Sequence, residues 1–328
     1  MRAAWYQRQG PARDVLVVGE MDAPDPGPGE VRIRVGASGI NPGDVKKRID
    51  AFGVGMPYPR IVPHSDGAGT IDQAGEGVPA ARVGERVWCH GAQSYRPFGT
   101  AAEYVVVAAA QALPLADGIA FERGACLGIP GITAHRAVHI GGSVRDRTVL
   151  VQGGGGAVGQ CAVALARHAG AHVIATARSA RDAASALRAG AHEAIRTDGL
   201  PIPEAAERIR RAAPRGVQHV VEVALDANIA LDEAVLAQAG SIAAYATGAA
   251  SQSLPFWPLL FKNARLFFIG SDDLAADAKA EAARALNATL AGRWPGFENI
   301  RILPLAAIAQ AHELVEAGGA GGRVVVAP

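Results

Sequence analysis

The sequence predicts an α/β protein in which a doubly wound parallel sheet of the Rossmann type is accompanied by a second, β-rich domain. From about Arg145 onward, short β-branched runs alternate with alanine-rich helical segments, as is typical of βαβ units. The first 120 or so residues instead contain short strand-like runs separated by turns rich in proline and glycine. A chain of 328 residues also exceeds the usual size of one hydrophobic core, so two domains are expected.

The elements follow from these patterns in chain order. In the N-terminal region, strands are expected at residues 31–35, 69–71, 86–88 and 103–107. The segment 22–30 is rich in proline and glycine and is interpreted as a turn before the first of these strands rather than as a linker.

In the second region, the expected strands are 148–151, 172–177, 218–223, 241–245 and 265–269, and the expected helices are 157–169, 180–189, 203–212 and 228–238. Helices at 276–291 and 306–316 and a strand at 323–326 then suggest a return to the first domain. We therefore expect a β-rich domain of residues 1–120 completed by 271–328, and a parallel-sheet domain of residues 121–270.

A glycine-rich turn joins the first strand of the expected parallel sheet to the first helix. It has the spacing Gly154-x-Gly156-x-x-Gly159. Glycine lets the backbone approach a pyrophosphate closely, and the start of the helix supplies unpaired N–H donors and a partial positive charge. Four consecutive glycines can also form a plain flexible loop, but the position between a strand and a helix favours dinucleotide binding.

The end of the second strand of this sheet indicates which dinucleotide is bound. NAD-binding sheets usually carry an acidic residue there for the ribose 2′-hydroxyl, and this sequence has none at that point. Arg178 and Arg181 follow instead, and a guanidinium group can pair with a 2′-phosphate. The pattern favours NADPH, with the alternative that both arginines are solvated charges. Ser179 is either a further donor or the N-cap of the next helix.

Charge and cysteine usage restrict the class of partner. The 32 Lys and Arg residues nearly balance the 31 Asp and Glu residues, and no basic run marks a nucleic-acid surface. We find neither an apolar signal segment nor a long apolar span, so a soluble, cytoplasmic protein without a membrane partner is expected. The three cysteines, Cys89, Cys126 and Cys161, form no CxxC pair and are expected to be buried hydrophobic residues.

Several spaced motifs in the same order resemble the medium-chain dehydrogenase/reductase superfamily, and most closely its zinc-free quinone oxidoreductase, zeta-crystallin-like, branch. These motifs are residues 39–44, 62–69, 98–104, 128–134, the glycine turn, 311–313 and 321–324. The resemblance implies an N-terminal GroES-like domain completed by the C-terminal segment, with the nucleotide-binding domain inserted between them. It also implies a homodimer formed through the nucleotide-binding domain.

The resemblance makes the absence of metal ligands informative. Zinc alcohol dehydrogenases of the superfamily use two cysteines and a histidine at positions that align here with Asn41, Ser65 and Ile129. Tetrahedral zinc needs thiolate or imidazole donors, so no metal is expected. His64 lies next to an aligned position, but it is interpreted as a packed or hydrogen-bonded histidine.

The resemblance also implies roles for individual residues. Asn41 and Thr133 would contact the ribose and nicotinamide, with a turn residue and a helix-start hydroxyl as the alternative readings. The other implied cofactor contacts are Gly154, Gly156, Ala157, Val158, Gly159, Phe268, Ile269 and Ser271, with a core residue as the alternative for Phe268. The aromatic candidates for the acceptor site are Tyr58, Tyr95, Phe256 and Trp257, with ordinary packing as the alternative for each. Lys46, Lys47 or Asp44 could donate a proton or merely be solvated, and no general acid is assigned.

The expected function is hydride transfer from NADPH to a quinone or a related conjugated carbonyl compound. Without a Lewis acid, a conjugated acceptor is the most reasonable substrate, because it delocalises the incoming charge. The alternatives are a 2-alkenal or enoyl-thioester reductase, and a non-catalytic NADPH-binding protein, crystallin-like or associated with RNA.

Overall fold

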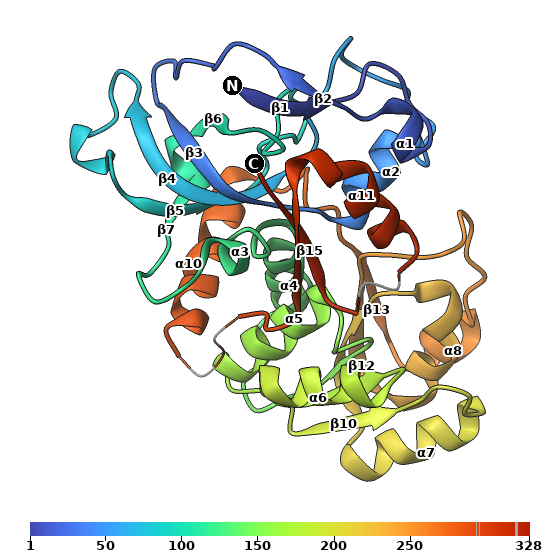
Figure 1. Cartoon of the computed structure of the whole chain (residues 1–328). Coiled ribbons are helices and arrows are strands. Elements are labelled where there is room, and N and C mark those ends of the chain that lie inside the picture. Colours follow the sequence, from blue (N-terminus) through green and yellow to red (C-terminus); the bar gives the residue numbers. More distant parts are fainter. Residues whose placement is uncertain (293, 295, 319–320) are drawn as a thin grey trace. The chain divides into compact units, whose positions relative to one another are not determined.

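A six-stranded parallel sheet organises the second half of the chain in the computed structural model, which describes residues 1–292, 294, 296–318 and 321–328 (Figure 1). The strand order is β10-β9-β8-β11-β12-β13, and every neighbouring pair is parallel. The strands are β8 (Thr148–Val151), β9 (His172–Ala177), β10 (Glu193–Arg196), β11 (Val217–Glu222), β12 (Leu236–Ala244) and β13 (Arg265–Phe268). The chain moves outward from β8 to β10, returns to β11 and continues outward to β13. This reversal defines a doubly wound Rossmann-type sheet, so the predicted fold class is confirmed.

Helices cover both faces of this sheet. They are α4 (Gly128–His139), α5 (Ala157–His168), α6 (Ala180–Ala189), α7 (Ile202–Ala212), α8 (Leu225–Val235), α9 (Phe256–Phe261) and α10 (Ala276–Leu290). Buried residues of α7 and α8 pack with Leu150, Ile174 and Val220 in one hydrophobic core. Alternate strand residues face the opposite side of the sheet. There Ala175 of β9 lies beside the glycine turn that begins α5 and beside Ala186 of α6.

The largest differences from the expected elements of this half are at β10 and at the junction of α8 and β12. Strand β10 was not predicted, because of its four residues only Ile195 is buried and Glu193 and Arg196 are exposed. The helix expected at 228–238 is α8, which begins at Leu225 and ends at Val235. The prediction that the helix continues to 238 was wrong, because the chain enters β12 directly at Leu236.

A second, mostly antiparallel sheet organises the rest of the chain. Its strand order is β14-β15-β3-β4-β5-β7, and β6 pairs with β3. The strands are β3 (Glu30–Gly39), β4 (Asp66–Ala74), β5 (Arg86–Cys89), β6 (Tyr104–Ala108), β7 (Ala112–Pro114), β14 (Ile300–Pro304) and β15 (Arg323–Ala327), with a separate hairpin of β1 (Arg2–Trp5) and β2 (Val17–Glu20). The helices are α1 (Ala12–Val15), α2 (Pro42–Arg48), α3 (Phe121–Gly124) and α11 (Ile308–Glu316). Because β15 pairs with β3, the C-terminal segment completes the β-rich sheet.

The chain forms two compact units, residues Met1–Ile129 with Phe297–Pro328, and residues Pro130–Gly296. Helix α10 packs on α5, so the second unit includes residues beyond β13. Among the described residues, no helix combines the length and the apolarity needed to cross a bilayer.

Candidate functional site

The glycine turn of the second unit connects β8 to α5. Gly153 has a positive φ of 63°, and the Gly154 N–H donates to Thr176 O on β9 at 2.9 Å. Gly156 is the N-cap of α5 and makes no side-chain cap, so the first turn of the helix begins at Ala157. The N–H groups of Ala157, Val158 and Gly159 belong to this turn, where a helix has no internal acceptors for its donors. They form an array suited to a phosphate group.

The turn is packed so closely that most of its glycines have no room for a side chain. A Cβ on Gly154 would lie 2.5 Å from Ala175 Cβ, and a Cβ on Gly159 would lie 2.2 Å from Gly153 O. Gly156 is exposed, and a Cβ added there would have Gly153 O, at 3.2 Å, as its nearest contact. The backbone of the turn is therefore tightly packed where it faces β9 and remains accessible to a ligand at Gly156, which fits the pyrophosphate of a dinucleotide.

The segment after β9 contains the residues predicted to choose the cofactor. Ser179 is the N-cap of α6: its Oγ accepts from the Asp182 N–H at 3.1 Å and donates to Asp182 Oδ2 at 2.7 Å. Its hydroxyl is thus used within the helix cap. Arg178 and Arg181 are both exposed.

Asp182 is a residue that the sequence pattern missed. A Cβ on Gly155 would lie 2.5 Å from both Asp182 Cα and Cβ, so this acidic residue packs against the glycine turn. The expected position for an acid was the end of β9, whereas Asp182 stands in the first turn of α6. The Ser-x-x-Asp spacing from Ser179 was the signal that could have found it.

The remaining cofactor candidates of this unit lie on other elements. Phe268 ends β13 and is 72% exposed, and Ile269 donates its N–H to Ala244 O at 2.9 Å. Ser271 is half-buried, and Thr133 is buried within α4. Phe268 is therefore no core residue of this unit.

In the first unit, a buried polar cluster forms around Asp66. The Asn41 Nδ2 donates to Asp66 Oδ2 at 2.7 Å, and the Ile129 N–H is 2.9 Å from both carboxyl oxygens. Arg323 donates to Asn41 Oδ1 at 2.9 Å, and the Asn41 N–H donates to Asp44 Oδ2 at 2.7 Å. Both ends of the Asn41 amide are thus engaged by other side chains.

The three positions that the resemblance aligns with zinc ligands carry no thiolate or imidazole group. Asn41, Ser65 and Ile129, which align with zinc ligands in the resemblance, offer an amide, a hydroxyl and an aliphatic side chain. Across the part of the chain that the structure describes, no group of three or more His, Cys, Asp or Glu side chains is arranged to hold a metal ion.

Burial raises the pKa of Asp66 to about 7, and the hydrogen bonds from Asn41 and Ile129 offset part of this effect. A carboxyl group with a raised pKa binds its proton more tightly in the folded chain, so stability falls as pH rises from about 4 to about 7. We expect a slope of up to about 1.4 kcal/mol per pH unit from this group. Urea unfolding of the native protein and of Asp66→Asn at several pH values tests this, since the difference in slope isolates Asp66. Equal slopes would contradict the assignment.

A second buried run of polar groups lies in the same unit. His64 and His312 approach each other at 2.9 Å between their Nε2 atoms, and His64 Nδ1 lies 2.8 Å from Ser38 Oγ. Ser38 contacts Thr100, whose Oγ1 donates to Asp66 O at 2.6 Å. At the other end, Arg48 Nε donates to His312 Nδ1 at 3.4 Å.

Burial lowers the pKa of His64 to about 3 and that of His312 well below its ordinary value. Both rings are therefore neutral at neutral pH. The sequence-based interpretation of His64 as a hydrogen-bonded histidine agrees with these contacts.

The structure brings together the two tyrosines predicted near the acceptor. Tyr58 donates its hydroxyl to Tyr95 O at 2.5 Å, and Tyr95 is 68% exposed with a positive φ of 54°. Lys46 lies over the Phe52 ring, and Lys47 donates to Gln93 Oε1 at 3.3 Å. Phe256 and Trp257 are in the other unit, on α9.

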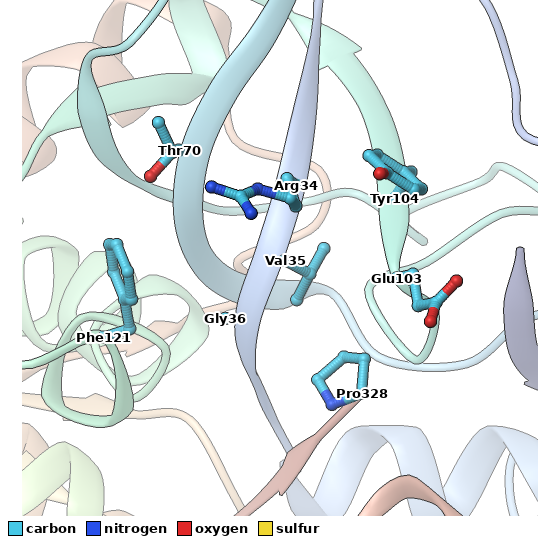
Figure 2. A pocket seen from close by; sticks show the side chains of 8 residues that line it. All are labelled: Arg34, Val35, Gly36, Thr70, Glu103, Tyr104, Phe121 and Pro328. Atoms are coloured by element: carbon cyan, nitrogen blue, oxygen red, sulfur yellow. The ribbon is translucent and has the colours of Figure 1, made fainter.

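A surface hollow of about 410 Å³ in the first unit lies elsewhere on the sheet (Figure 2). Its lining includes Arg34, Thr70, Tyr104 and Phe121, none of which is among the predicted site residues. The Phe121 ring occupies the space next to Gly36, where an added Cβ would lie 2.6 Å from Phe121 Cδ2. The hollow shares no residue with the Asp66 cluster.

Comparison with protein families gives two matches. Residues 27–117 match the alcohol dehydrogenase GroES-like domain, and residues 157–287 match the zinc-binding dehydrogenase family. Quinone oxidoreductase of Rattus norvegicus is 31% identical over 246 residues, which cover 74% of this chain and 72% of the relative. The Mus musculus quinone oxidoreductase is 27% identical over 330 residues, with 99% and 97% of the two chains covered.

Solved structures resemble the chain along its whole length. A mycobacterial protein solved in complex with NADPH has a TM-score of 0.83 and 25% identity, with 100% of each chain covered. A structure described as an NAD-dependent alcohol dehydrogenase has a TM-score of 0.86 and 27% identity, again with 100% of each chain covered. These likenesses span both units of the fold.

Proposed function

The chain belongs to the medium-chain dehydrogenase/reductase superfamily, in its quinone oxidoreductase branch, and from this premise we propose that it transfers a hydride from NADPH to a quinone or a related conjugated carbonyl compound. The observation that carries the proposal is the glycine turn between β8 and α5. Its backbone is packed from behind and open at Gly156, at the start of a helix in a Rossmann-order sheet.

In this proposal, bound NADPH supplies the hydride and the protein supplies position. The N–H groups of the first turn of α5 hold the pyrophosphate, with Val158 beside it. Ile269 and Ser271 follow β13 and line the nicotinamide side, and Thr133 contacts it from α4. These residues orient the cofactor and exclude water, which is the main task of a protein whose cofactor carries the chemistry.

We propose that the reaction needs no zinc. The positions that would ligate zinc in related alcohol dehydrogenases hold Asn41, Ser65 and Ile129. In their place stands the Asp66 cluster, in which Asn41 is hydrogen-bonded to Asp66 and Arg323. A conjugated acceptor suits such a site, because the carbonyl group of the substrate takes up the charge.

The decisive experiment mixes the purified protein with NADPH or NADH and follows cofactor oxidation with a quinone, an enone, an enoyl thioester and an aldehyde. Turnover of the quinone or enone supports the proposal. Preference for the enoyl thioester favours the reductase alternative, and NADPH binding without any turnover favours a non-catalytic NADPH-binding protein. Absence of NADPH binding would exclude all three.

We propose that Arg178 and Arg181 cause a preference for NADPH. Both are exposed and follow β9, the second strand of the parallel sheet. Replacing both by alanine removes charge-assisted bonds to a 2′-phosphate, so we expect the Kd for NADPH to rise about tenfold or more while the Kd for NADH is unchanged. Fluorescence titration with both cofactors measures this. Arg215→Ala is the control, because Arg215 is exposed at the other end of the sheet, before β11. An equal loss of affinity for NADPH and for NADH would contradict this assignment.

We also propose a homodimer formed through α9 and the edge strand β13. Helix α9 carries an aromatic patch, with Phe256, Trp257 and Phe261 each more than 60% exposed, and Trp257 stacks on Phe261 at 6.1 Å. Within the described sheet β13 pairs only with β12, so its outer edge is open to a second copy.

Trp257→Glu is expected to convert this dimer into a monomer, because a carboxylate in an aromatic interface is costly to desolvate. Sedimentation velocity at micromolar protein measures the change. Val54→Glu is the matched control, since Val54 is 76% exposed and lies in the other unit. A native protein that sediments as a monomer would refute the interface.

A further inference from the structure

A run of buried polar side chains lies directly behind the glycine turn. The Gly153 N–H donates to Thr176 Oγ1 at 3.0 Å, and Thr176 donates its hydroxyl to Gln152 Oε1 at 2.6 Å. The Gln152 Nε2 in turn donates to Asp232 Oδ1 at 2.7 Å. Thr176, Gln152 and Asp232 are 3%, 2% and 0% exposed, so water does not compete for these bonds. The turn is thus connected, one hydrogen bond at a time, to a carboxyl group on α8.

That carboxyl group has a second buried carboxyl group, Glu222 at the end of β11, as its electrostatic neighbour. Glu222 Oε1 accepts from the Ala224 N–H and from Asn228 Nδ2. Among the described residues, no N–H or hydroxyl donor reaches Glu222 Oε2 or Asp232 Oδ2. One proton shared between these carboxyl groups satisfies both, whereas two neighbouring buried carboxylates would repel each other.

The surrounding groups place the proton on Asp232. Glu222 accepts from two N–H donors and Asp232 from one, so Glu222 is the better-stabilised carboxylate and Asp232 donates to it. Burial raises the pKa of both groups, and that of Asp232 lies well above its ordinary value. Of the further titratable groups, Tyr245, after β12, lies near Glu222, and Cys161, on α5, lies near Tyr245. Burial raises the pKa of Tyr245 as well, so it adds no charge at neutral pH.

We propose that protonated Asp232, paired with Glu222, is a positioning residue for the cofactor. Through Gln152 and Thr176 it holds Gly153 in its left-handed conformation and so sets the N–H array at the start of α5. This role rests on the proposed binding of NADPH at the turn. Its consequence is a link between affinity and protonation: when the pair loses its proton at alkaline pH, repulsion displaces Asp232 from Gln152, and the turn loses its support.

Two sets of variants test the link. Thr176→Val removes the hydroxyl at nearly constant volume, and Thr176→Ser restores it. Asp232→Asn keeps an acceptor for Gln152 and supplies a permanent donor to Glu222, so it imitates the protonated acid at every pH. NADPH Kd is measured by fluorescence titration from neutral to alkaline pH. Hydrogen exchange of the peptide containing Gly153 is measured without cofactor.

We expect Thr176→Val to raise the Kd for NADPH about tenfold, as for one buried donor left without a partner, and Thr176→Ser to bind like the native protein. Native affinity falls at alkaline pH, whereas Asp232→Asn keeps a flat profile. A Thr176→Val protein that is less stable but binds NADPH normally would overturn the proposal, and so would identical pH profiles for the native protein and Asp232→Asn.

The exchange measurement separates this proposal from the proposed function. If the native protein does not bind NADPH, the proposed function fails, and Gly153 exchange still tests the network. Faster exchange in Thr176→Val and native exchange in Asp232→Asn support it. Unchanged exchange in Thr176→Val refutes it.

Discussion

Gly159→Ala is expected to weaken NADPH binding about 100-fold, the equivalent of losing two charge-assisted hydrogen bonds. The added Cβ would lie 2.2 Å from Gly153 O and 2.8 Å from Gly154 Cα, far inside normal contact distance. The start of α5 must then move away from the turn, and its N–H groups move with it. Helix propensity alone would make the folded protein about 1 kcal/mol more stable with alanine, so a weaker helix would not explain a loss of affinity.

Isothermal titration with NADPH measures the loss, and circular dichroism establishes that the variant is folded. Gly118→Ala is the control, because an added Cβ there meets nothing within 4 Å and Gly118 lies in the other unit. Native affinity in Gly159→Ala would show that the turn does not bind the pyrophosphate.

Arg48→Met is expected to lower the free energy of unfolding by about 3 kcal/mol. Arg48 is fully buried and donates to Gly10 O, to His312 Nδ1 and to Glu316 on α11. Methionine fills a similar volume but leaves these acceptors, one of them a carboxylate, without a donor. Urea unfolding followed by tryptophan fluorescence measures the change, since Trp5 and Trp88 lie in this unit.

Arg13→Met is the matched control. Arg13 also pairs with a carboxylate of α11, Glu313 at 2.6 Å, but its side chain is 76% exposed. Solvent screens such a pair, so no measurable loss of stability is expected. Equal losses in the two variants would mean that burial does not decide the strength of these pairs.

The parallel sheet could be predicted from sequence because its signals are local. The strand at 148–151 and the helix at 180–189 have the expected bounds. The strand is a continuous apolar run, and the helix is a capped, amphipathic segment. Strand β10 gave no such signal, since an edge strand with charged ends does not differ in pattern from a turn. The end of α8 at Val235 was missed because no glycine or proline separates it from β12.

For the candidate site, motif spacing identified the glycine turn but not what supports it. Asp232 lies 80 residues from Gln152, and Arg323 lies 282 residues from Asn41. Such contacts depend on how strands are ordered in a sheet, and local sequence does not encode that order. The role of Asn41 toward the cofactor stays a prediction, and its sequence motif gave no sign that its amide lies between Asp66 and Arg323.

The hydrogen-bond partners in the buried run from Arg48 to Asp66 determine where its hydrogen atoms lie. A guanidinium has only donors, so His312 Nδ1 must accept from Arg48, and His312 carries its single proton on Nε2. His64 then accepts at Nε2 and carries its proton on Nδ1. From the opposite end, Thr100 gives its only proton to Asp66 O, so Ser38 donates to Thr100 and accepts from His64.

The contacts at both ends therefore require the same donor-to-acceptor direction. Every hydrogen bond of the run donates from the Arg48 side toward the Asp66 side. Each histidine is confined to one tautomer, and each hydroxyl to one rotamer. One guanidinium on α2 thereby determines the tautomer of a histidine 264 residues later in the chain.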